Sequence, residues 1–378
     1  MKSILVATWL VVGVLSLAAS ALAAGVVLEK VPEDGVQPQV VVAPDGVAHL
    51  VYLKGERMSC DVRYTRRVSG ATEWQKPMTV NSERGSAIAA GTIRGAQMAL
   101  GKGGSVQVIW NGHGTAGGGH GHQTSPMLYA RLDPGAQSFT PQANLLGNTA
   151  ALDGGASIAA NGTGFVHVVW HGLPEGKSGE AERVVLLRLS TDDGRTFAEP
   201  RALTADQPGV CSCCSLRAHI SDEGVLSVLY RAATIPQERG MTWLTMAPNG
   251  SIRIQPVQEW RTPKCPMSSA SMLRDARGLR GAWETDGRVF TGILGSDPST
   301  WQAGGPKDTK HPSMAVNAKG ETMIAMALGS GFAKAGKLYW RTLDRDGKPS
   351  EAATGDDLPL ASFPATYARP DGTFVILH

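Results

Sequence analysis

Five cysteines are the residues most able to carry chemistry in this sequence, and three of them lie close together. Cys211, Cys213 and Cys214 form a Cys-x-Cys-Cys motif, while Cys60 and Cys265 lie elsewhere in the chain. Thiolates bind soft or borderline metal ions, copper and zinc among them. The spacing is not that of a zinc finger, and no second Cys-x-x-Cys accompanies it. One prediction is therefore a metal site that draws on these five cysteines.

Histidine and methionine side chains add further possible ligands. The candidate histidines are His113, His120 and His122 in the Gly-rich stretch HGTAGGGHGH, together with His171. Met58, Met127 and Met267 lie beside these positions, and thioether together with thiolate favours copper over zinc. A Gly-His-Gly stretch can equally be a flexible loop with solvated histidines. It lacks the Lys-Ser/Thr pair of a phosphate-binding loop, so no nucleotide site is expected there.

The elements that must position these residues are short hairpins that recur along the chain. In each copy a small-residue run leads into a turn that ends in Gly, and a strand follows that closes on a large residue. The copies span 38–52, 95–110, 156–170, 215–230, 268–283, 312–326 and 364–378. Their turn glycines are Gly46, Gly104, Gly164, Gly224, Gly278, Gly320 and Gly372. Such a repeat predicts an all-β structure rather than a mixed one.

A repeat of about 40–60 residues built from short alternating strands is typical of a β-propeller. Outer strand pairs are expected between the inner hairpins, giving four strands in each blade. The repeat count predicts seven blades, and six if one unit within 286–352 is irregular. The segment 24–31 (AGVVLEKV) has no partner of its own, so we expect it to dock beside the last hairpin and close the ring.

Propeller geometry sorts the loops onto two faces. The turns inside the inner hairpins lie on one face. Loops that leave an inner hairpin or lead into the next one lie on the other, here called the lead-in face. All five cysteines and the candidate histidines fall on the lead-in face. Residues just after the closing aromatics should point into it as well; these are Asn111, His171, Arg231 and Glu284.

Disulfide bonds are the alternative use of the cysteines. Five cysteines in an exported chain would ordinarily form two bridges and leave one thiol over. Cys265 precedes the hairpin that follows the Cys-x-Cys-Cys motif, so a bridge between these neighbouring units is easy to form. Cys60 would have to meet a partner across the lead-in face. The odd count and the adjacency of Cys213 and Cys214 favour metal, because a vicinal disulfide is strained. Both alternatives stay open.

Residues 1–23 have the pattern of a cleavable signal peptide. Lys2 is followed by the apolar stretch 4–17, and Ala21-Leu22-Ala23 forms a small-x-small cleavage site. We therefore expect a periplasmic or secreted protein whose mature chain, 24–378, is one propeller domain without a membrane span. The formal charge of +3 is spread along the sequence, which argues against a nucleic-acid partner.

The stretch STDDGRTF contains an Asp-box pattern. Its matching residues are Ser190, Asp192, Gly194, Thr196 and Phe197. With the hairpin repeat, this box resembles the sialidase-like (BNR-repeat) propeller superfamily over almost the whole mature chain. The Asp box is a structural turn and says little about function. The segment 209–234 with KCPMSSAS at 264–271 is further similar to exported bacterial proteins labelled exo-α-sialidase, which carry a Cys-x-Cys-Cys.

Sialidase activity is the alternative that this resemblance implies. Sialidases begin a three-arginine carboxylate clamp in a Phe/Tyr-Arg-Ile-Pro motif, whereas the corresponding stretch here is Val36-Gln37-Pro38-Gln39, without arginine. They also need a Tyr nucleophile backed by a Glu. Arg231, Glu284 and Tyr367 are candidates for these roles, and no spacing singles them out.

Three function classes follow from these residues. The first is an exported propeller that binds a metal ion, copper or zinc, or a small ligand among its cysteines and histidines. The second is a glycoside hydrolase of sialidase type. The third is a non-catalytic module that binds a glycan or a protein. The sequence does not decide whether the protein is an enzyme, nor its oligomeric state.

Overall fold

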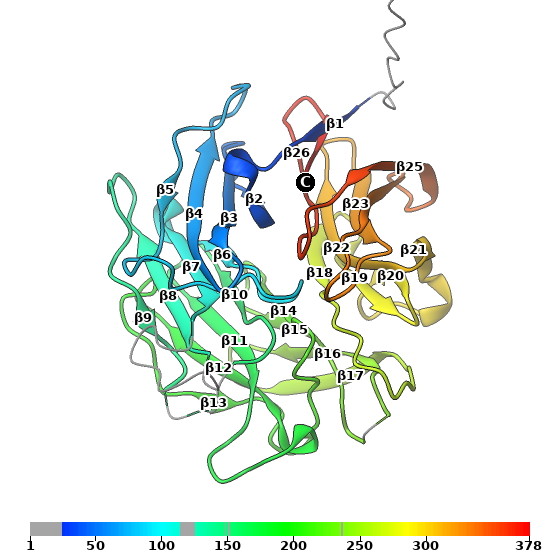
Figure 1. Cartoon of the computed structure of the whole chain (residues 1–378). Helices are drawn as coiled ribbons and strands as arrows, with labels where there is room; N and C mark the ends of the chain where they lie inside the picture. Colours follow the sequence, from blue (N-terminus) through cyan, green and yellow to red (C-terminus); the bar gives the residue numbers. More distant parts are fainter. Residues whose placement is uncertain (1–24, 114–124, 148, 150–151, 236) are drawn as a thin grey trace, which may run out of the picture.

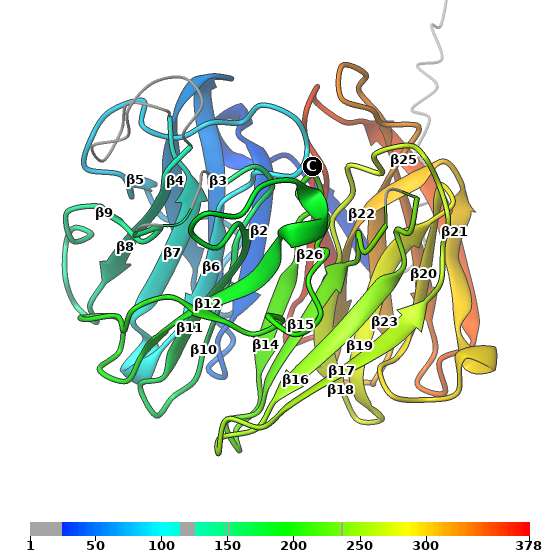
Figure 2. The ribbon, with the colours of Figure 1, turned by 90° about the horizontal axis from the view of Figure 1, so that it is seen from below.

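A ring of seven blades forms this protein, and its computed structural model describes residues 25–113, 125–147, 149, 152–235 and 237–378 (Figure 1). The expected signal peptide, 1–23, and two candidate ligands, His120 and His122, lie outside these described residues. The inner strand of each blade contributes to the wall of a central channel. Figure 2 shows the same ring turned by a right angle, with the strands running between its two faces.

Six blades have four strands each, in simple sequence order. Blade 1 contains β2 (Val36–Val42), β3 (Ala48–Glu56), β4 (Ser59–Arg67) and β5 (Met78–Thr79). Blade 2 contains β6 (Gln97–Leu100), β7 (Val106–Asn111), β8 (Met127–Leu132) and β9 (Ala143–Asn144). Blade 3 contains β10 (Ser157–Ala160), β11 (Val166–Gly172), β12 (Val184–Ser190) and β13 (Arg201–Ala202).

The next three blades repeat this plan. Blade 4 contains β14 (Arg217–Ile220), β15 (Leu226–Arg231), β16 (Met241–Met246) and β17 (Ile252–Gln258). Blade 5 contains β18 (Ser271–Asp275), β19 (Gly278–Thr285), β20 (Arg288–Ile293) and β21 (Gln302–Lys307). Blade 6 contains β22 (Thr309–Val316), β23 (Thr322–Leu328), β24 (Lys337–Leu343) and β25 (Pro349–Asp357). Short 3-10 turns lie at η1 (Pro32–Asp34), η2 (Lys102–Gly104), η4 (Glu180–Glu182) and η5 (Pro298–Thr300).

Blade 7 closes the ring with both ends of the chain. It contains β26 (Ala365–Ala368), β27 (Phe374–Leu377) and, from the other end, β1 (Val26–Glu29). Strand β1 pairs in parallel with β27, with Val26 opposite Phe374. This confirms the expected closure by the N-terminal segment, which covers a strand edge that would otherwise be unpaired.

The seven turn glycines explain why the hairpin repeats so regularly. All seven have positive φ, from +78° at Gly320 to +140° at Gly278, a backbone region that favours glycine. The large residues that close the second strands are buried between blades, with Trp110, Trp170 and Trp283 at most 2% exposed. Each blade thus buries one face against its neighbour, and the prediction of a seven-bladed propeller is confirmed.

Irregular backbone on the lead-in face ties neighbouring blades together. We call the segment that precedes each inner strand its lead-in loop. The Ser215 hydroxyl donates to the Ile93 carbonyl at 3.0 Å, which links the lead-in loops of blades 4 and 2. Gln37 Nε2 donates to the carbonyls of Gly91 at 2.6 Å and Ala361 at 2.8 Å, which links blades 1, 2 and 7. Among the described residues, no helix has the length and apolar character to cross a membrane.

Candidate functional site

Four sulfur atoms gather in the lead-in loop of blade 4 and its neighbour in blade 5. Cys213 and Cys265 form a disulfide, and Cys211 and Cys214 are free thiols. Cys211 Sγ lies 3.3 Å from Cys213 Sγ and 3.6 Å from Cys214 Sγ. We call these four residues the sulfur cluster. In the described part of the chain, Cys211, Cys213 and Cys214 are the one group of three potential metal ligands whose donor atoms all lie within 4.8 Å of one another.

Backbone hydrogen bonds from three blades fix the lead-in loop that carries the cluster. They run from Cys211 N to Arg231 O at 2.9 Å, from Gly154 N to Ser212 O at 2.9 Å, and from Ser215 N to Ser268 O at 3.2 Å. The Glu180 carboxylate accepts a further bond from Ser212 N at 3.2 Å, and Arg239 pairs with the same carboxylate at 2.7 Å. The sulfur positions are therefore set by loop contacts that no local sequence pattern encodes.

The loop also divides the cluster into a buried part and an accessible part. Cys211 and Cys214 are 1% and 3% exposed, whereas Cys213 is half-buried and Cys265 is exposed. The two free thiols pack with Ala233 in a small apolar group of their own. Solvent therefore meets the disulfide first, and the thiols lie behind it.

A buried ion pair lies beside the two free thiols. Arg231, at the end of β15, and Glu284, near the end of β19, are 3% and 1% exposed. Their charged groups lie 3.5 Å apart, and Arg231 also donates to Ser268 Oγ at 3.2 Å. Glu284 Oε1 accepts from Gly287 N at 2.6 Å. The structure thus brings two of the three catalytic candidates, Arg231 and Glu284, to the cysteines rather than to a separate site.

These charges make the two buried thiols unequal. Burial by itself raises the pKa of Cys214, but the S–H of Cys211, the Arg231 charge and a backbone hydrogen bond from Ser268 together lower it below the usual range. The hydrogen bond to Cys214 and burial raise the pKa of Cys211. Of the two, Cys214 is therefore the sulfur whose deprotonation its surroundings favour, and Cys211 is the thiol that donates to it.

His171 packs against the backbone of the sulfur cluster. It is fully buried at the end of β11, and a Cβ atom at Gly154 would lie 2.7 Å from His171 Nε2, 2.7 Å from Ser212 O and 3.0 Å from Cys214 O. Among the described residues, neither ring nitrogen has a hydrogen-bond partner. Burial lowers the pKa of His171 to about 4, so the ring is neutral at pH 7. The neutral ring thus packs against the loop of the sulfur cluster without joining the group of close potential ligands, which among the described residues contains cysteines only.

The remaining predicted residues lie elsewhere. Cys60 is buried among the hydrophobic residues of blades 1 and 2, outside the sulfur cluster. His113 is half-buried directly after β7, where its backbone N donates to Ser86 O at 2.7 Å. Tyr367 lies in blade 7, where its hydroxyl accepts a hydrogen bond from Arg67 at 2.7 Å and its ring meets Trp74 edge-on. The structure therefore does not bring Cys60 or Tyr367 to the other candidates.

The positions that follow the closing aromatics share a structural role. Asn111, His171, Arg231 and Glu284 were predicted to point into the lead-in face, and all four are buried. Asn111 donates to Gly154 O in the lead-in loop of blade 3 at 3.2 Å. In the same way, Arg231 donates to Ser268 Oγ in the lead-in loop of blade 5. Sequence reasoning missed three supporting residues of the site: Ser268, Glu180 and Arg239. They come from different blades, so no spacing could have indicated them.

The Asp-box turn follows β12. Asp192 Oδ1 accepts from the backbone N of Arg195 at 3.0 Å and of Thr196 at 2.9 Å, and Ser190 Oγ accepts from Gly194 N at 2.8 Å. Phe197 packs edge-on against a tyrosine of blade 2, with ring centroids 5.0 Å apart. These contacts hold a turn together, and the turn lies on the face opposite the sulfur cluster.

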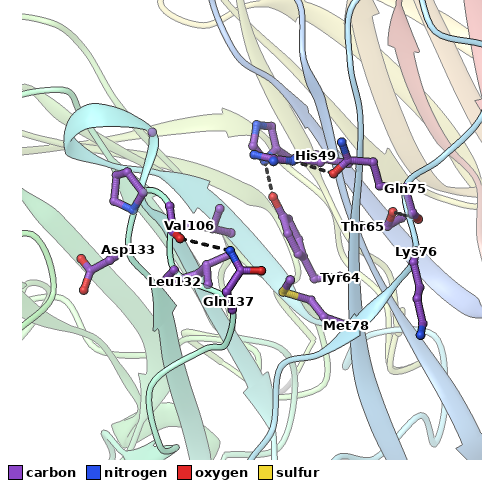
Figure 3. A pocket seen from close by; sticks show the side chains of 15 residues that line it. His49, Tyr64, Thr65, Gln75, Lys76, Met78, Val106, Leu132, Asp133 and Gln137 are labelled. Atoms are coloured by element: carbon purple, nitrogen blue, oxygen red, sulfur yellow. Dashed lines mark hydrogen bonds between the residues drawn. The ribbon is translucent and has the colours of Figure 1, made fainter.

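A hollow of about 200 Å³ opens between blades 1 and 2, beside the turn glycine Gly104 (Figure 3). At its wall, His49 Nδ1 and Tyr64 Oη are hydrogen bonded at 2.7 Å. Burial lowers the pKa of His49 to about 4 and raises that of Tyr64 to about 12. These two polar groups satisfy each other, and the lining contains no cysteine, so this hollow is a weaker candidate than the sulfur cluster.

The central channel, with a volume of about 450 Å³, is lined by the inner strands of all seven blades. Its wall carries polar side chains, among them Gln39, Ser157 and His219. Arg217 of β14 also lines it, and burial lowers the pKa of this residue to about 10. Within the part of the chain that the structure describes, neither an ion pair nor a hydrogen bond engages the Arg217 side chain. The channel could thus accept a polar ligand, most readily an anionic one.

A scan against protein-family models and a search of curated proteins found no match. Among solved structures, the α-L-arabinanase of Penicillium chrysogenum complexed with arabinobiose matches with a TM-score of 0.54 at 11% identity, over 84% of this chain and 95% of that chain. The Trypanosoma rangeli sialidase complexed with the inhibitor DANA matches with a TM-score of 0.51 at 12% identity, over 83% and 54%. A Dyadobacter fermentans protein of unknown function matches with a TM-score of 0.51 at 14% identity, over 85% and 93%.

These similarities concern the fold, because all three identities are low. The chain spans about half the length of the sialidase and nearly the whole length of the other two. The arabinanase structure holds a sugar and the sialidase structure an inhibitor, so this fold accommodates ligands of that kind. The resemblance read from the hairpin repeat and the Asp box is thereby confirmed: the chain has the sialidase-like β-propeller fold.

Proposed function

We propose that the protein is an exported propeller whose sulfur cluster binds a soft metal ion, with Cu(I) favoured over zinc. One observation carries this proposal. Cys211 and Cys214 are two buried, free thiols with Sγ atoms 3.6 Å apart, and the unpartnered imidazole of His171 packs against their loop. Thiolate and neutral imidazole are donors that copper and zinc accept.

The number of available donors favours Cu(I). Cys213 is bonded to Cys265, so its sulfur is a poor ligand until that bridge is reduced. Two thiolates then remain close enough to share an ion, two donors short of the four that structural zinc takes. Soft thiolate ligands select Cu(I), which does not require four of them. Cys211 and Cys214 would therefore hold the ion, and the ion would supply one-electron redox chemistry.

Arg231 supports this proposal through its charge. Two thiolates on a monovalent cation carry a net negative charge, which is costly to bury unless a cation lies nearby. Arg231 lies beside Cys214 and is held by Glu284, Ser268 and the Arg239 carbonyl, which accepts at 2.7 Å.

Glycoside hydrolysis has less support. Where sialidases carry the first arginine of their clamp, this chain has Gln37, which is fully buried and donates to lead-in loop carbonyls. Its amide ties three blades together instead of facing a ligand. Tyr367 is 4% exposed and lies apart from Glu284, so the resemblance does not assemble a nucleophile pair. Binding of a glycan in the central channel, next to Arg217, is the remaining alternative.

The test is metal analysis of the exported protein, purified without chelator, followed by Cu(I) titration against a chromophoric competitor in the presence of a mild reductant. We expect close to one Cu(I) per chain. The Cys211→Ser/Cys214→Ser variant should lose this stoichiometric binding, because both thiolate ligands are gone.

Cys60→Ala is the matched control, since it also removes a buried thiol but one outside the cluster, and it should bind like the parent protein. Equal Cu(I) binding by the double serine variant would overturn the proposal. Metal-free protein that binds a sugar on a glycan array would favour the glycan-binding alternative instead.

A further inference from the structure

The sulfur cluster holds a disulfide and a dithiol in direct contact. Cys211 Sγ lies 3.3 Å from Cys213 Sγ, which is itself bonded to Cys265. Cys214 Sγ lies 3.6 Å from Cys211 Sγ, on the far side from solvent. One disulfide bond and two sulfur–sulfur contacts therefore connect the exposed residue Cys265 to the buried residue Cys214.

We propose that the sulfur cluster is a thiol–disulfide exchange site, in which the buried Cys211–Cys214 dithiol reduces the Cys213–Cys265 disulfide and frees Cys265 to react with thiols or disulfides of other molecules. This activity uses the sulfurs in their metal-free state, so it does not depend on the Cu(I) proposal. A thiolate attacks a disulfide sulfur and forms a mixed disulfide, so the attacking sulfur must lie in contact with the sulfur that it attacks.

In the first step, Cys211 Sγ attacks Cys213 Sγ. The Cys211–Cys213 bond forms, the Cys213–Cys265 bond breaks, and the electron pair leaves on Cys265 Sγ, which takes a proton from water. The proton of Cys211 passes to water. The leaving sulfur is the exposed one, so its new charge is solvated at once.

In the second step, Cys214 gives its proton to solvent and attacks Cys211 Sγ. The Cys211–Cys214 bond forms, the Cys211–Cys213 bond breaks, and the electron pair leaves on Cys213 Sγ. Cys211 and Cys214 have the Cys-x-x-Cys spacing that also closes in disulfide oxidoreductases. One disulfide is consumed and one is made, so no outside oxidant or reductant is required.

The surroundings suit a site that exchanges rather than a disulfide that only braces the fold. Arg231 lies beside Cys214 and is fixed there by Glu284 and Ser268, so a positive charge stays next to the buried dithiol throughout the exchange. The apolar packing around Cys211 and Cys214 keeps other nucleophiles away. Cys265, by contrast, lies where another molecule can reach it.

The experiment uses full-length exported protein, freed of metal with chelator and kept without reductant. N-ethylmaleimide is added to the native protein at pH 8, and samples are mapped over time by mass spectrometry for labelled cysteines and for disulfide connectivity. We expect Cys265 to become labelled while a Cys211–Cys214 bridge appears, at a rate independent of protein concentration.

Three variants give the expected pattern its controls. Cys211→Ser should slow labelling of Cys265 at least tenfold, because it lacks the attacking sulfur. Cys214→Ser should stop at the Cys211–Cys213 bridge. Cys60→Ala should behave like the parent chain.

Connectivity in the parent protein decides the matter even if a variant fails to fold. If Cys213–Cys265 stays the only bridge and Cys265 stays unlabelled, the disulfide is structural and the proposal is wrong. A rate of Cys265 labelling that rises with protein concentration would also overturn the proposal, because exchange would then occur between molecules.

Discussion

Cys60 and Cys214 are both buried cysteines on the lead-in side of the propeller, but different neighbours surround them. Cys60 begins β4 among apolar side chains of blades 1 and 2, and its backbone pairs with Ala87. Burial, followed by the charge of Asp61, raises the pKa of Cys60 to about 12. At Cys214, the thiol of Cys211, the guanidinium of Arg231 and a backbone hydrogen bond with Ser268 lower the pKa by more than burial raises it.

The difference shows that burial alone does not decide what a cysteine does. Cys60 behaves as a small apolar residue that is protonated at any physiological pH, and it lies outside the sulfur cluster. Cys214 is poised as a thiolate beside two further sulfurs, with a charged pair behind it. The groups that distinguish Cys214 from Cys60 come from blades 4 and 5. A variant that removes them should therefore make the surroundings of Cys214 resemble those of Cys60.

Replacement of Arg231 by methionine should have the largest effect on stability. It keeps most of the side-chain volume but leaves Glu284 buried without its partner and Cys214 without the nearby positive charge. Loss of one member of a buried pair costs about 3–5 kcal/mol in the free energy of unfolding. Urea denaturation of the metal-free protein measures this loss.

The pairing itself is tested by the double variant Arg231→Met/Glu284→Gln. It removes both charges, so it should regain most of the stability that Arg231→Met loses. A single variant as stable as the parent protein would show that the ion pair does not hold this region, and that Cys214 is less different from Cys60 than its surroundings indicate.

His171 should make the same region sensitive to acid. Burial lowers its folded-state pKa from 6.5 to about 4, and the Arg183 charge adds to this effect. Above about pH 6.5 the ring is neutral in both states, so it causes no loss. As pH falls from about 6.5 to about 4, the unfolded chain binds a proton that the folded protein does not, and stability falls by up to about 3 kcal/mol.

The control for this pH dependence is His171→Gln, which cannot titrate. The difference in free energy of unfolding between the parent protein and this variant should change between pH 7 and pH 4, with the parent protein losing more. A pH-independent difference would contradict the buried neutral state of His171. His311, also buried, has a pKa lowered to about 3 and titrates in both proteins, so it cancels in the comparison.

The sequence was sufficient for the fold and for one half of the site. Turn glycines and closing aromatics recur because each blade needs the same turn and the same buried contact, so their spacing records the architecture. The Cys-x-Cys-Cys motif and the position of Cys265 in the next repeat likewise predicted a possible disulfide. The structure has one disulfide, Cys213–Cys265, rather than the two that an exported chain with five cysteines would ordinarily form.

The other half of the site could not be read from the sequence. The resemblance to sialidases suggested Arg231 and Glu284 as catalytic residues. Their contact with the cysteines depends instead on the path of two lead-in loops. Glu180 reaches Ser212 from the connection before β12, which no repeat predicts. Loop paths follow from many weak contacts rather than from a periodic pattern, so they appear only in the structure.

The smallest effect is expected at Cys60, and it tests the other side of the comparison. Cys60→Ala removes one buried sulfur from a packed core and should cost about 1 kcal/mol through the small cavity it leaves. Cys60→Ser fills the same space but buries a hydroxyl among apolar side chains, so it should cost about 1–3 kcal/mol. Urea denaturation at pH 7 gives both values. If serine is tolerated as well as alanine, Cys60 has a polar partner in solution, and its environment is closer to that of Cys214 than the packing around it implies.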